Sequence, residues 1–361
     1  MGSQQLPLVA PLSQASGRLV VPDVLRGVAI LGMLIAHAKP LLPSLPPGVP
    51  LAMGSANDVA SPLFALVMGL SAEILTQRTP PAGRGGMLLQ QVARGLVLIA
   101  LGVWMSYWGS WVAIVLSFLG VLLLIGAPIL LLSTRWVIGI AIGLAVVSDP
   151  VNAWARQTLW PLLWNVPVVN LISDWFVFGY AYRLTNLLPF FLLGAILMRH
   201  GFRRDKYLWA MAVIAPLAYA VRPVVTAVFD TPAHVSGSYV DTLHDVGLVF
   251  AVYVVIVFLD TVRSPRPARI IAIAFEPLRA IGAVALSLYV LHVALIALWV
   301  RTGMMVTENE YVRWLLLVPG IVVVGWLWWR FIGVGPVEWL LGWVTGRPKR
   351  WRRDRSSTAV E

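Results

Sequence analysis

The sequence carries three ionisable side chains in one apolar run, DVLRGVAILGMLIAH, which extends from Asp23 to His37. Ionisable residues inside membrane-spanning segments cost about 2.5–3.5 kcal/mol each on insertion scales, so each needs a reason. Arg26 and His37 are eleven residues apart, which is close to three helical turns and about 16 Å along a helix axis. The spacing predicts that both lie on one helix face, each toward a different half of a membrane. The alternative is that Asp23 and Arg26 are boundary residues that reach the interface, and that His37 is interfacial.

A histidine in this position suits acid–base or nucleophilic chemistry, because it can take a proton from an attacking group or form a transient covalent intermediate. Asp58 begins the next apolar run, NDVASPLFALVMG, and would lie near His37 if the two helices pack antiparallel. Two interpretations of Asp58 stay open. It caps a helix N-terminus, or it orients His37 and holds the basic tautomer.

A second group of polar residues lies in AHVSGSYVDTLHD, which contains His234, Ser236, Asp241, His244 and Asp245. Two histidines and two aspartates suggest a metal, but no His-x-x-x-His unit occurs, and we expect no metal site. A polar funnel wall that binds a hydroxylated substrate fits better, with His234, Ser236 and Asp241 as the contacts.

The run ALSLYVLH places Ser287, Tyr289 and His292 within an apolar segment. Tyr289 and His292 are three residues apart and share a helix face. They either hold helices together through hydrogen bonds or bind substrate. Glu276 and Arg279 precede this run and are expected to pair with each other, whereas the sequence indicates no partner for Arg222.

The elements that must position these residues are membrane-spanning helices. Of the 361 residues, 59% are hydrophobic and 12% are charged, with a mean hydropathy of +0.82, whereas soluble domains are about 45–50% apolar and about 25% charged.

The net charge of +11 lies in short clusters between apolar runs, which is typical of membrane topology signals and not of nucleic-acid binding. The sequence has no cysteine, which excludes disulfides and thiolate chemistry. The first 20 or so residues do not have the pattern of a cleaved signal peptide.

A span needs about 20 apolar residues, and on that measure the sequence predicts an all-α polytopic protein with about ten spans. Basic loops alternate with loops poor in Lys and Arg, which predicts cytoplasmic N- and C-termini. We expect a cytoplasmic segment at 1–22, one transmembrane domain at 23–345 and a basic tail at 346–361. The Trp-rich stretch between about Asp149 and Tyr182 is expected to form an interfacial or re-entrant lid, and Gly335–Val344 an interfacial helix. The spans are expected to start near Val24, Ala60, Met87, Trp111, Trp136, Arg183, Tyr207, Tyr239, Ala280 and Arg313.

The pattern R-x-x-x-x-D-x-x-R-G-x-A at Arg18–Ala29 resembles the opening of the transmembrane acyltransferase superfamily, which includes acyltransferase family 3 and the heparan-α-glucosaminide N-acetyltransferase family. The spacing of Arg26 and His37 is similar to the family 3 pattern. The segments NDVASPLFALVMGLS, YRLTNLLPFFLLGAIL, AHVSGSYVDTLHDVG, ALSLYVLH and RFIGVGPVEWLL resemble the heparan-type branch and an allied uncharacterised bacterial family.

The resemblance implies transfer of an acyl group, usually acetyl from acetyl-CoA, across the bilayer to a hydroxyl or amine of a glycan. Asp23 and Arg26 would then bind the donor, His37 and Asp58 would catalyse, and the outer polar residues with Tyr289 and His292 would bind the acceptor. Short outer loops favour a lipid-linked sugar or a small glycoside as the acceptor. The expected location is a bacterial inner membrane. A homo-oligomer is possible, and the sequence does not determine the oligomeric state. The rival hypotheses are a transporter or flippase without chemistry and an envelope scaffold that recruits partners through the basic tail.

Overall fold

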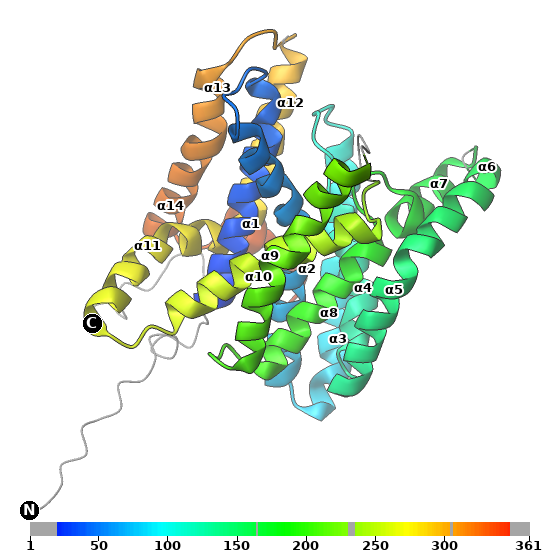
Figure 1. Cartoon of the computed structure of the whole chain (residues 1–361), viewed down its shortest axis with the longest axis vertical. Helices are drawn as coiled ribbons and strands as arrows, with labels where there is room; N and C mark the ends of the chain where they lie inside the picture. Colours follow the sequence, from blue (N-terminus) through cyan, green and yellow to red (C-terminus); the bar gives the residue numbers. More distant parts are fainter. Residues whose placement is uncertain (1–19, 164, 230–234, 304–305, 347–361) are drawn as a thin grey trace, which may run out of the picture.

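The structure is a computed structural model, and it describes residues 20–163, 165–229, 235–303 and 306–346. Most of the described part of the chain is helical, which confirms the all-α prediction. The longer helices form a bundle, and α5 to α7 project to one side of it (Figure 1). In chain order the helices are α1 (Val20–Ala38), η2 (Lys39–Leu41), α2 (Val49–Arg78), η3 (Pro81–Gly83), α3 (Arg84–Ser106), α4 (Leu116–Ile129), α5 (Thr134–Thr158), α6 (Trp160–Leu163), α7 (Pro167–Ser173), η4 (Asp174–Phe178), α8 (Leu184–His200), α9 (Lys206–Phe229), α10 (Tyr239–Asp260), α11 (Pro265–Ala283), α12 (Ala285–Arg301), α13 (Tyr311–Leu315), η5 (Leu316–Gly320), α14 (Ile321–Phe331) and α15 (Pro336–Val344).

Helices α1 and α2 form the centre of the bundle. In their most apolar windows 67% and 61% of the residues are buried, against 17% in α5 and 11% in α9. The exposed side chains of the outer helices include large apolar residues such as Ile142, Val213 and Leu217. Such surfaces are suited to contact with lipid, because the exposure of large apolar side chains to water is unfavourable. The chain is therefore built as an integral membrane protein with its chemistry-bearing first helix at the core.

Two glycines bring α1 and α11 into backbone contact. A Cβ at Gly27 would clash with the backbone of Leu278, and a Cβ at Gly282 would clash with the backbone of Asp23. Small residues at such crossings let helices approach closely in membranes. This approach lets Arg26 reach the carbonyl oxygen of Gly282 at 3.4 Å.

The lengths of the helices differ from the expectation of about ten full spans. Helices occur at or close to all ten expected starts, but α2 already begins at Val49, well before Ala60. Seven described helices are long and apolar enough to cross a membrane, and the pair α11 and α12, bent by 71°, is an eighth candidate. Helices α4 and α8 fall in the shorter class. Helix α11 begins at Pro265, within a segment that we expected to be one of the basic loops. Proline is favoured in the first turn of a helix and disfavoured in its interior.

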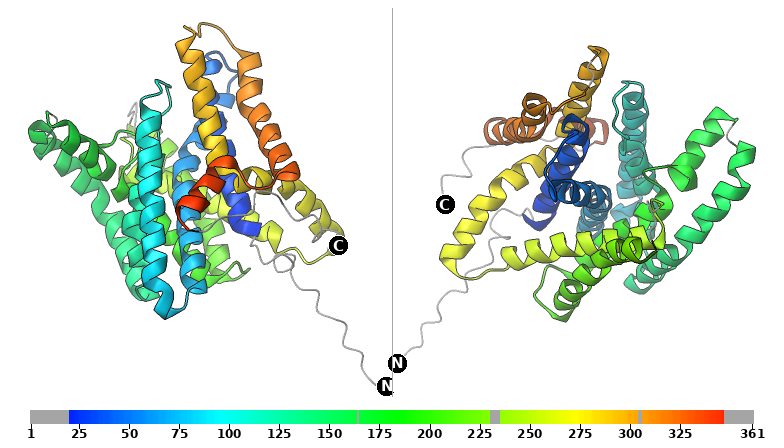
Figure 2. Two further views of the ribbon diagram at one scale, coloured as in Figure 1. Left: turned by 180° about the vertical axis from the view of Figure 1, so that it is seen from behind. Right: turned by 45° about the horizontal axis from the view of Figure 1, so that its top comes forward.

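The short helix α15 closes the described part of the chain at the expected interfacial segment. The view from behind shows α15, in red, across the end of α12 (Figure 2). Glu338 of α15 accepts hydrogen bonds from the backbone N–H of Leu286 at 2.7 Å and of Ser287 at 3.1 Å, and from the Ser287 hydroxyl. These N–H groups belong to the first turn of α12, which the break after α11 leaves without helical partners. Glu338 therefore caps α12 from a distant part of the chain.

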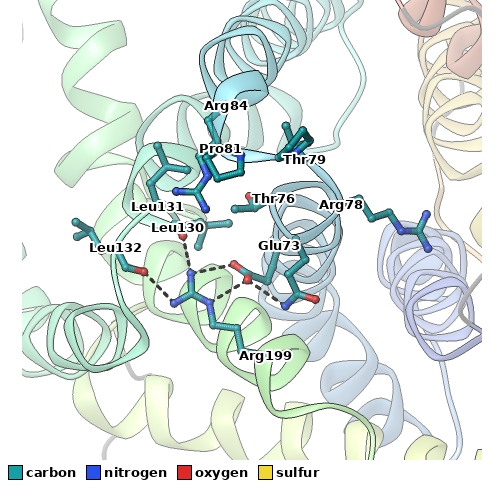
Figure 3. Close-up of a pocket in the computed structure, with 12 residues that line it drawn as sticks. Glu73, Thr76, Arg78, Thr79, Pro81, Arg84, Leu130, Leu131, Leu132 and Arg199 are labelled. Carbon is teal, nitrogen blue, oxygen red and sulfur yellow. Dashed lines mark hydrogen bonds and ion pairs between the residues drawn. The ribbon is translucent and has the colours of Figure 1, made fainter.

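A buried ion pair joins the ends of α2, α4 and α8. Arg199 contacts Glu73 with an Nε–Oε1 distance of 3.0 Å, and it also donates to the carbonyl oxygens of Leu130 and Leu132 (Figure 3). The Glu73 side chain is only 4% exposed. A neighbouring cavity of about 540 Å³ is lined in part by Arg78 and Arg84. None of the predicted site residues lines this cavity, so we assign the ion pair a role in helix packing.

Candidate active site

His37 of α1 and His292 of α12 form a hydrogen-bonded pair. His37 Nδ1 and His292 Nε2 are 2.9 Å apart, and the two rings are nearly parallel, at 12°. On its other side, His292 Nδ1 lies 3.2 Å from the carbonyl oxygen of Leu288. A carbonyl oxygen only accepts hydrogen bonds, so His292 carries its proton on Nδ1 and accepts at Nε2. His37 must then donate from Nδ1, which leaves its Nε2 unprotonated and basic.

Further contacts hold this pair in place. The Tyr289 ring meets His292 edge-on, with centroids 5.1 Å apart, and its hydroxyl accepts a hydrogen bond from the Val115 N–H at 3.1 Å. Trp111 donates from its indole nitrogen to the carbonyl oxygen of His37 at 3.0 Å. His292 is completely buried. The segment before α4 thus fixes both histidine-bearing helices, and sequence reasoning did not assign Trp111 this function.

Two cavities share lining residues, and His37 borders the smaller of them. The larger has a volume of about 360 Å³, and its lining residues include Arg26, Ser71, Arg94 and Tyr289. The smaller has a volume of about 20 Å³ and includes His37. Both are lined by Phe64 and Val115. Phe64 and Val115 therefore form part of the wall of both cavities.

Arg26 borders the larger cavity from α1. Its guanidinium lies 3.2 Å from Asp23, in an i, i+3 ion pair, and donates to the Ser71 hydroxyl at 2.8 Å. The side chain keeps 26% of its surface exposed. The structure therefore places Arg26 and Asp23 at one end of α1 and His37 at the other, with adjoining cavities between Arg26 and His37.

Asp58 does not contact His37 as expected. It pairs with Arg222 of α9, and its Oδ2 lies 3.7 Å from His244 Nε2. It does not cap α2 either, because that helix begins at Val49 and places Asp58 in its interior. The expectation was wrong because the first turns of α2 lie within a segment that the sequence indicated as a loop. His292 holds the position next to His37 that was assigned to Asp58.

Arg222 joins two acids from different helices. It donates to Asp58 of α2 and to Asp241 of α10, the latter at 3.0 Å, and it lies 2.8 Å from His244 Nε2. Asp241 also accepts from the Gly237 N–H at 2.8 Å. The partner of Arg222, which the sequence did not indicate, is therefore this pair of carboxylates.

The remaining predicted residues lie near this cluster or away from it. Ser236 lines a small cavity with Asp241, and its carbonyl oxygen accepts a hydrogen bond from Arg183. Ser287 is bonded to Glu338, and Glu276 contacts Arg330 at 4.0 Å in place of the expected Arg279. His234 lies outside the described residues. Within the described ranges no group of three or more acidic, His or Cys side chains is arranged to hold a metal ion.

The sequence was also compared with known proteins. No curated protein matches it significantly. The sequence model of the acyltransferase domain family matches residues 20–337. This range includes both histidines of the pair, Arg26 and the linked charged residues of α2, α9 and α10. The chain therefore belongs to acyltransferase family 3.

Proposed function

We propose that this membrane acyltransferase moves a short acyl group, acetyl in the simplest case, from acyl-CoA to a hydroxyl or amine of a glycan or lipid-linked sugar. The observation that supports the proposal is the directed hydrogen-bond chain from the Leu288 carbonyl oxygen through His292 to His37. It leaves a basic nitrogen beside a cavity that adjoins a second, arginine-bordered one. A general base needs a free lone pair and a fixed orientation, and this arrangement supplies both.

The larger cavity suits the donor. Its border holds Arg26 and Arg94, and its interior is mainly apolar, with Leu98, Leu116 and Leu119 among the lining residues. Arginine binds phosphate groups through paired N–H donors, while an apolar channel suits the uncharged arm that carries a thioester. On the predicted orientation this cavity faces the cytoplasm, where acyl-CoA is found.

The reaction that we assign is a single displacement. His37 Nε2 takes the proton from the acceptor hydroxyl or amine as its oxygen or nitrogen bonds to the acyl carbon. The carbon–sulfur bond breaks, and the proton passes from His37 to the leaving thiolate. Meanwhile the Nδ1–H of His37 keeps its hydrogen bond to His292, which stabilises the transient imidazolium. Base catalysis of this kind contributes roughly 10²–10⁴-fold to a rate.

The size of the cavity at His37 favours a small acyl group. Its volume of about 20 Å³ exceeds only slightly the roughly 10–15 Å³ that one water molecule needs on this measure. A methyl group fits such a space, and a long acyl chain does not unless Phe64 moves. We therefore propose acetyl-CoA as donor, in a bacterial inner membrane with both termini in the cytoplasm.

The test is CoA release by the full-length protein in lipid nanodiscs, with acetyl-CoA and a glycolipid extract of the host membrane. The His37→Ala variant should lose at least a hundredfold in rate. The matched control is His200→Ala, because His200 pairs with Asp205 at 2.5 Å, and neither residue lines the two cavities. Equal release by all three proteins would refute the proposal. Solute flux without acetyl-CoA would support the transporter instead.

A further inference from the structure

A third cavity lies beside the charged cluster of α2, α9 and α10. Its volume is about 30 Å³, and Arg183, Asn186 and Asp245 are among its lining residues. It shares Ser61 and Tyr182 with the cavity at His37. The same two side chains therefore form part of the wall of both spaces.

Arg183 lines this cavity, and its guanidinium has a donor without a partner. It is only 1% exposed, and its Nη2 donates to the carbonyl oxygen of Ser236. Its buried Nε has no hydrogen-bond partner. Within the described part of the chain no carboxylate forms an ion pair with Arg183. A buried guanidinium in this state is costly unless something completes its hydrogen bonds.

Asp245 presents a matching acceptor. It lines the same cavity from α10, and its carboxylate accepts no hydrogen bond from the side chains and backbone groups that the structure describes. The neighbouring acids Asp58 and Asp241 are already paired with Arg222. A donor and an acceptor, each without a protein partner, thus border one small polar space.

We propose that this cavity binds neighbouring hydroxyl groups of a sugar ring, with Arg183 donating to one oxygen and Asp245 accepting from the other. The inference rests on the proposed function and adds a subsite for the acceptor. A volume of about 30 Å³ holds one or two groups the size of water, so it takes the edge of a ring and not the whole ring. Because Ser61 and Tyr182 border both cavities, a ring held here lies next to the cavity that His37 borders.

Other ligand classes fit the charges less well. A phosphate or carboxylate would meet Asp245 in the same space, and the nearby cation Arg222 is already paired with Asp58 and Asp241. An amine or metal cation would meet the buried guanidinium of Arg183. A neutral diol both donates and accepts, which is what one free donor and one free carboxylate require.

The experiment measures binding by saturation-transfer NMR on the full-length protein in nanodiscs. The probes are the methyl glycosides of glucose, galactose and mannose, with their monodeoxy analogues and inorganic phosphate. Hydrogen bonds to charged groups are worth about tenfold to a hundredfold in affinity, and Asp245→Asn and Arg183→Gln should each weaken the best glycoside by that factor. One monodeoxy analogue should lose little more affinity on Asp245→Asn, and a different one little more on Arg183→Gln, because in each case both changes remove the same contact.

Matched controls remove the same charges close to the cavity. Asp149 and Arg156 lie within electrostatic reach of Arg183 but do not line the cavity. Asp149→Asn and Arg156→Gln should therefore bind the glycoside within about twofold of the native protein. Acetyl-CoA binding, measured in parallel on every variant, reports whether the fold and the donor cavity are intact.

Three outcomes would overturn the inference. One is that no glycoside of the panel binds while His37-dependent CoA release persists, which leaves the proposed function standing. Another is equal weakening by the control variants. The third is phosphate binding that depends on Arg183 and excludes the sugar. Failure of the proposed function has a different signature, namely CoA release that does not depend on His37.

Discussion

Replacing His292 tests whether the histidine pair sets the tautomer of the catalytic base. In His292→Phe the ring volume stays similar, but the acceptor 2.9 Å from His37 Nδ1 is removed. The Nδ1–H of His37 then loses its partner in a buried site, at a cost of about 1–3 kcal/mol, and the imidazolium that forms during transfer loses a charge-assisted hydrogen bond worth about 1.5–3 kcal/mol. With about 1.4 kcal/mol for each factor of ten, the lost charge-assisted hydrogen bond should lower kcat roughly tenfold to 140-fold. The KM for acetyl-CoA should change little, since His292 does not line the larger cavity.

The assay is initial-rate CoA release at several acetyl-CoA concentrations. His292→Gln is the conservative partner variant, because its amide oxygen can accept the hydrogen bond from His37 and should restore a large part of kcat. The double variant His37→Ala, His292→Phe should be no slower than His37→Ala alone, since the two residues act as one unit. The reasoning would be refuted by full kcat in His292→Phe, or by a rise in KM for acetyl-CoA with kcat unchanged.

Three further predictions concern the donor cavity, the crossing of α1 and α11, and the buried ion pair of Glu73 and Arg199. Phe64→Ala should raise kcat/KM for butyryl-CoA relative to acetyl-CoA by about tenfold, because Phe64 borders both cavities and two methylenes are worth about 1.6 kcal/mol; an unchanged ratio in competition assays would contradict the size argument. Gly282→Ala should destabilise the protein by about 1–3 kcal/mol and raise the KM for acetyl-CoA, because the added methyl group separates α1 from α11 next to Arg26. A melting temperature and a KM equal to those of the native protein would contradict this prediction. Arg199→Met should cost about 3–5 kcal/mol because it leaves Glu73 charged and buried, whereas the double variant with Glu73→Met should recover stability; chemical denaturation in nanodiscs measures both, and no recovery would disprove the pairing.

Local patterns were sufficient to predict the helical class and the arrangement of α1. The spacing of Arg26 and His37 depends only on helix geometry, so the sequence indicated correctly that they occupy opposite ends of one helix. The contacts of Asp58, in contrast, depend on where α2 begins, and Val49–Asn57 contains proline, glycine and polar residues that favour a loop locally. Tertiary packing against the neighbouring helices outweighs that preference. Helix α11 was missed for a similar reason: the sequence indicated a span only from about Ala280, and the packing of α11 against α1 depends on Gly27 and Gly282, which lie far apart in the sequence.

His292 shows the same limit at the site itself. Its position within ALSLYVLH predicted a polar group in mid-membrane, and both interpretations, helix contact and substrate binding, were compatible with that position. Only the packing of α12 against α1 reveals that its partner is His37. Arg183 lies in the YRLTN segment, at the start of an apolar run, and this position could have been noted from the sequence. Its burial, which makes it a candidate for ligand binding, depends on residues of α10 and of the preceding loop.

The wall formed by Phe64 and Val115 also has a bioenergetic consequence. A membrane protein with two neighbouring cavities could conduct protons through a chain of water molecules that joins them, and so dissipate the membrane potential. Two apolar side chains between the cavities interrupt such a chain, because they offer water no hydrogen-bond partners. At 100 mV each proton that leaked would waste about 2.3 kcal/mol. The two side chains that restrict the size of the acyl group thus also interrupt a path for protons between the cavities.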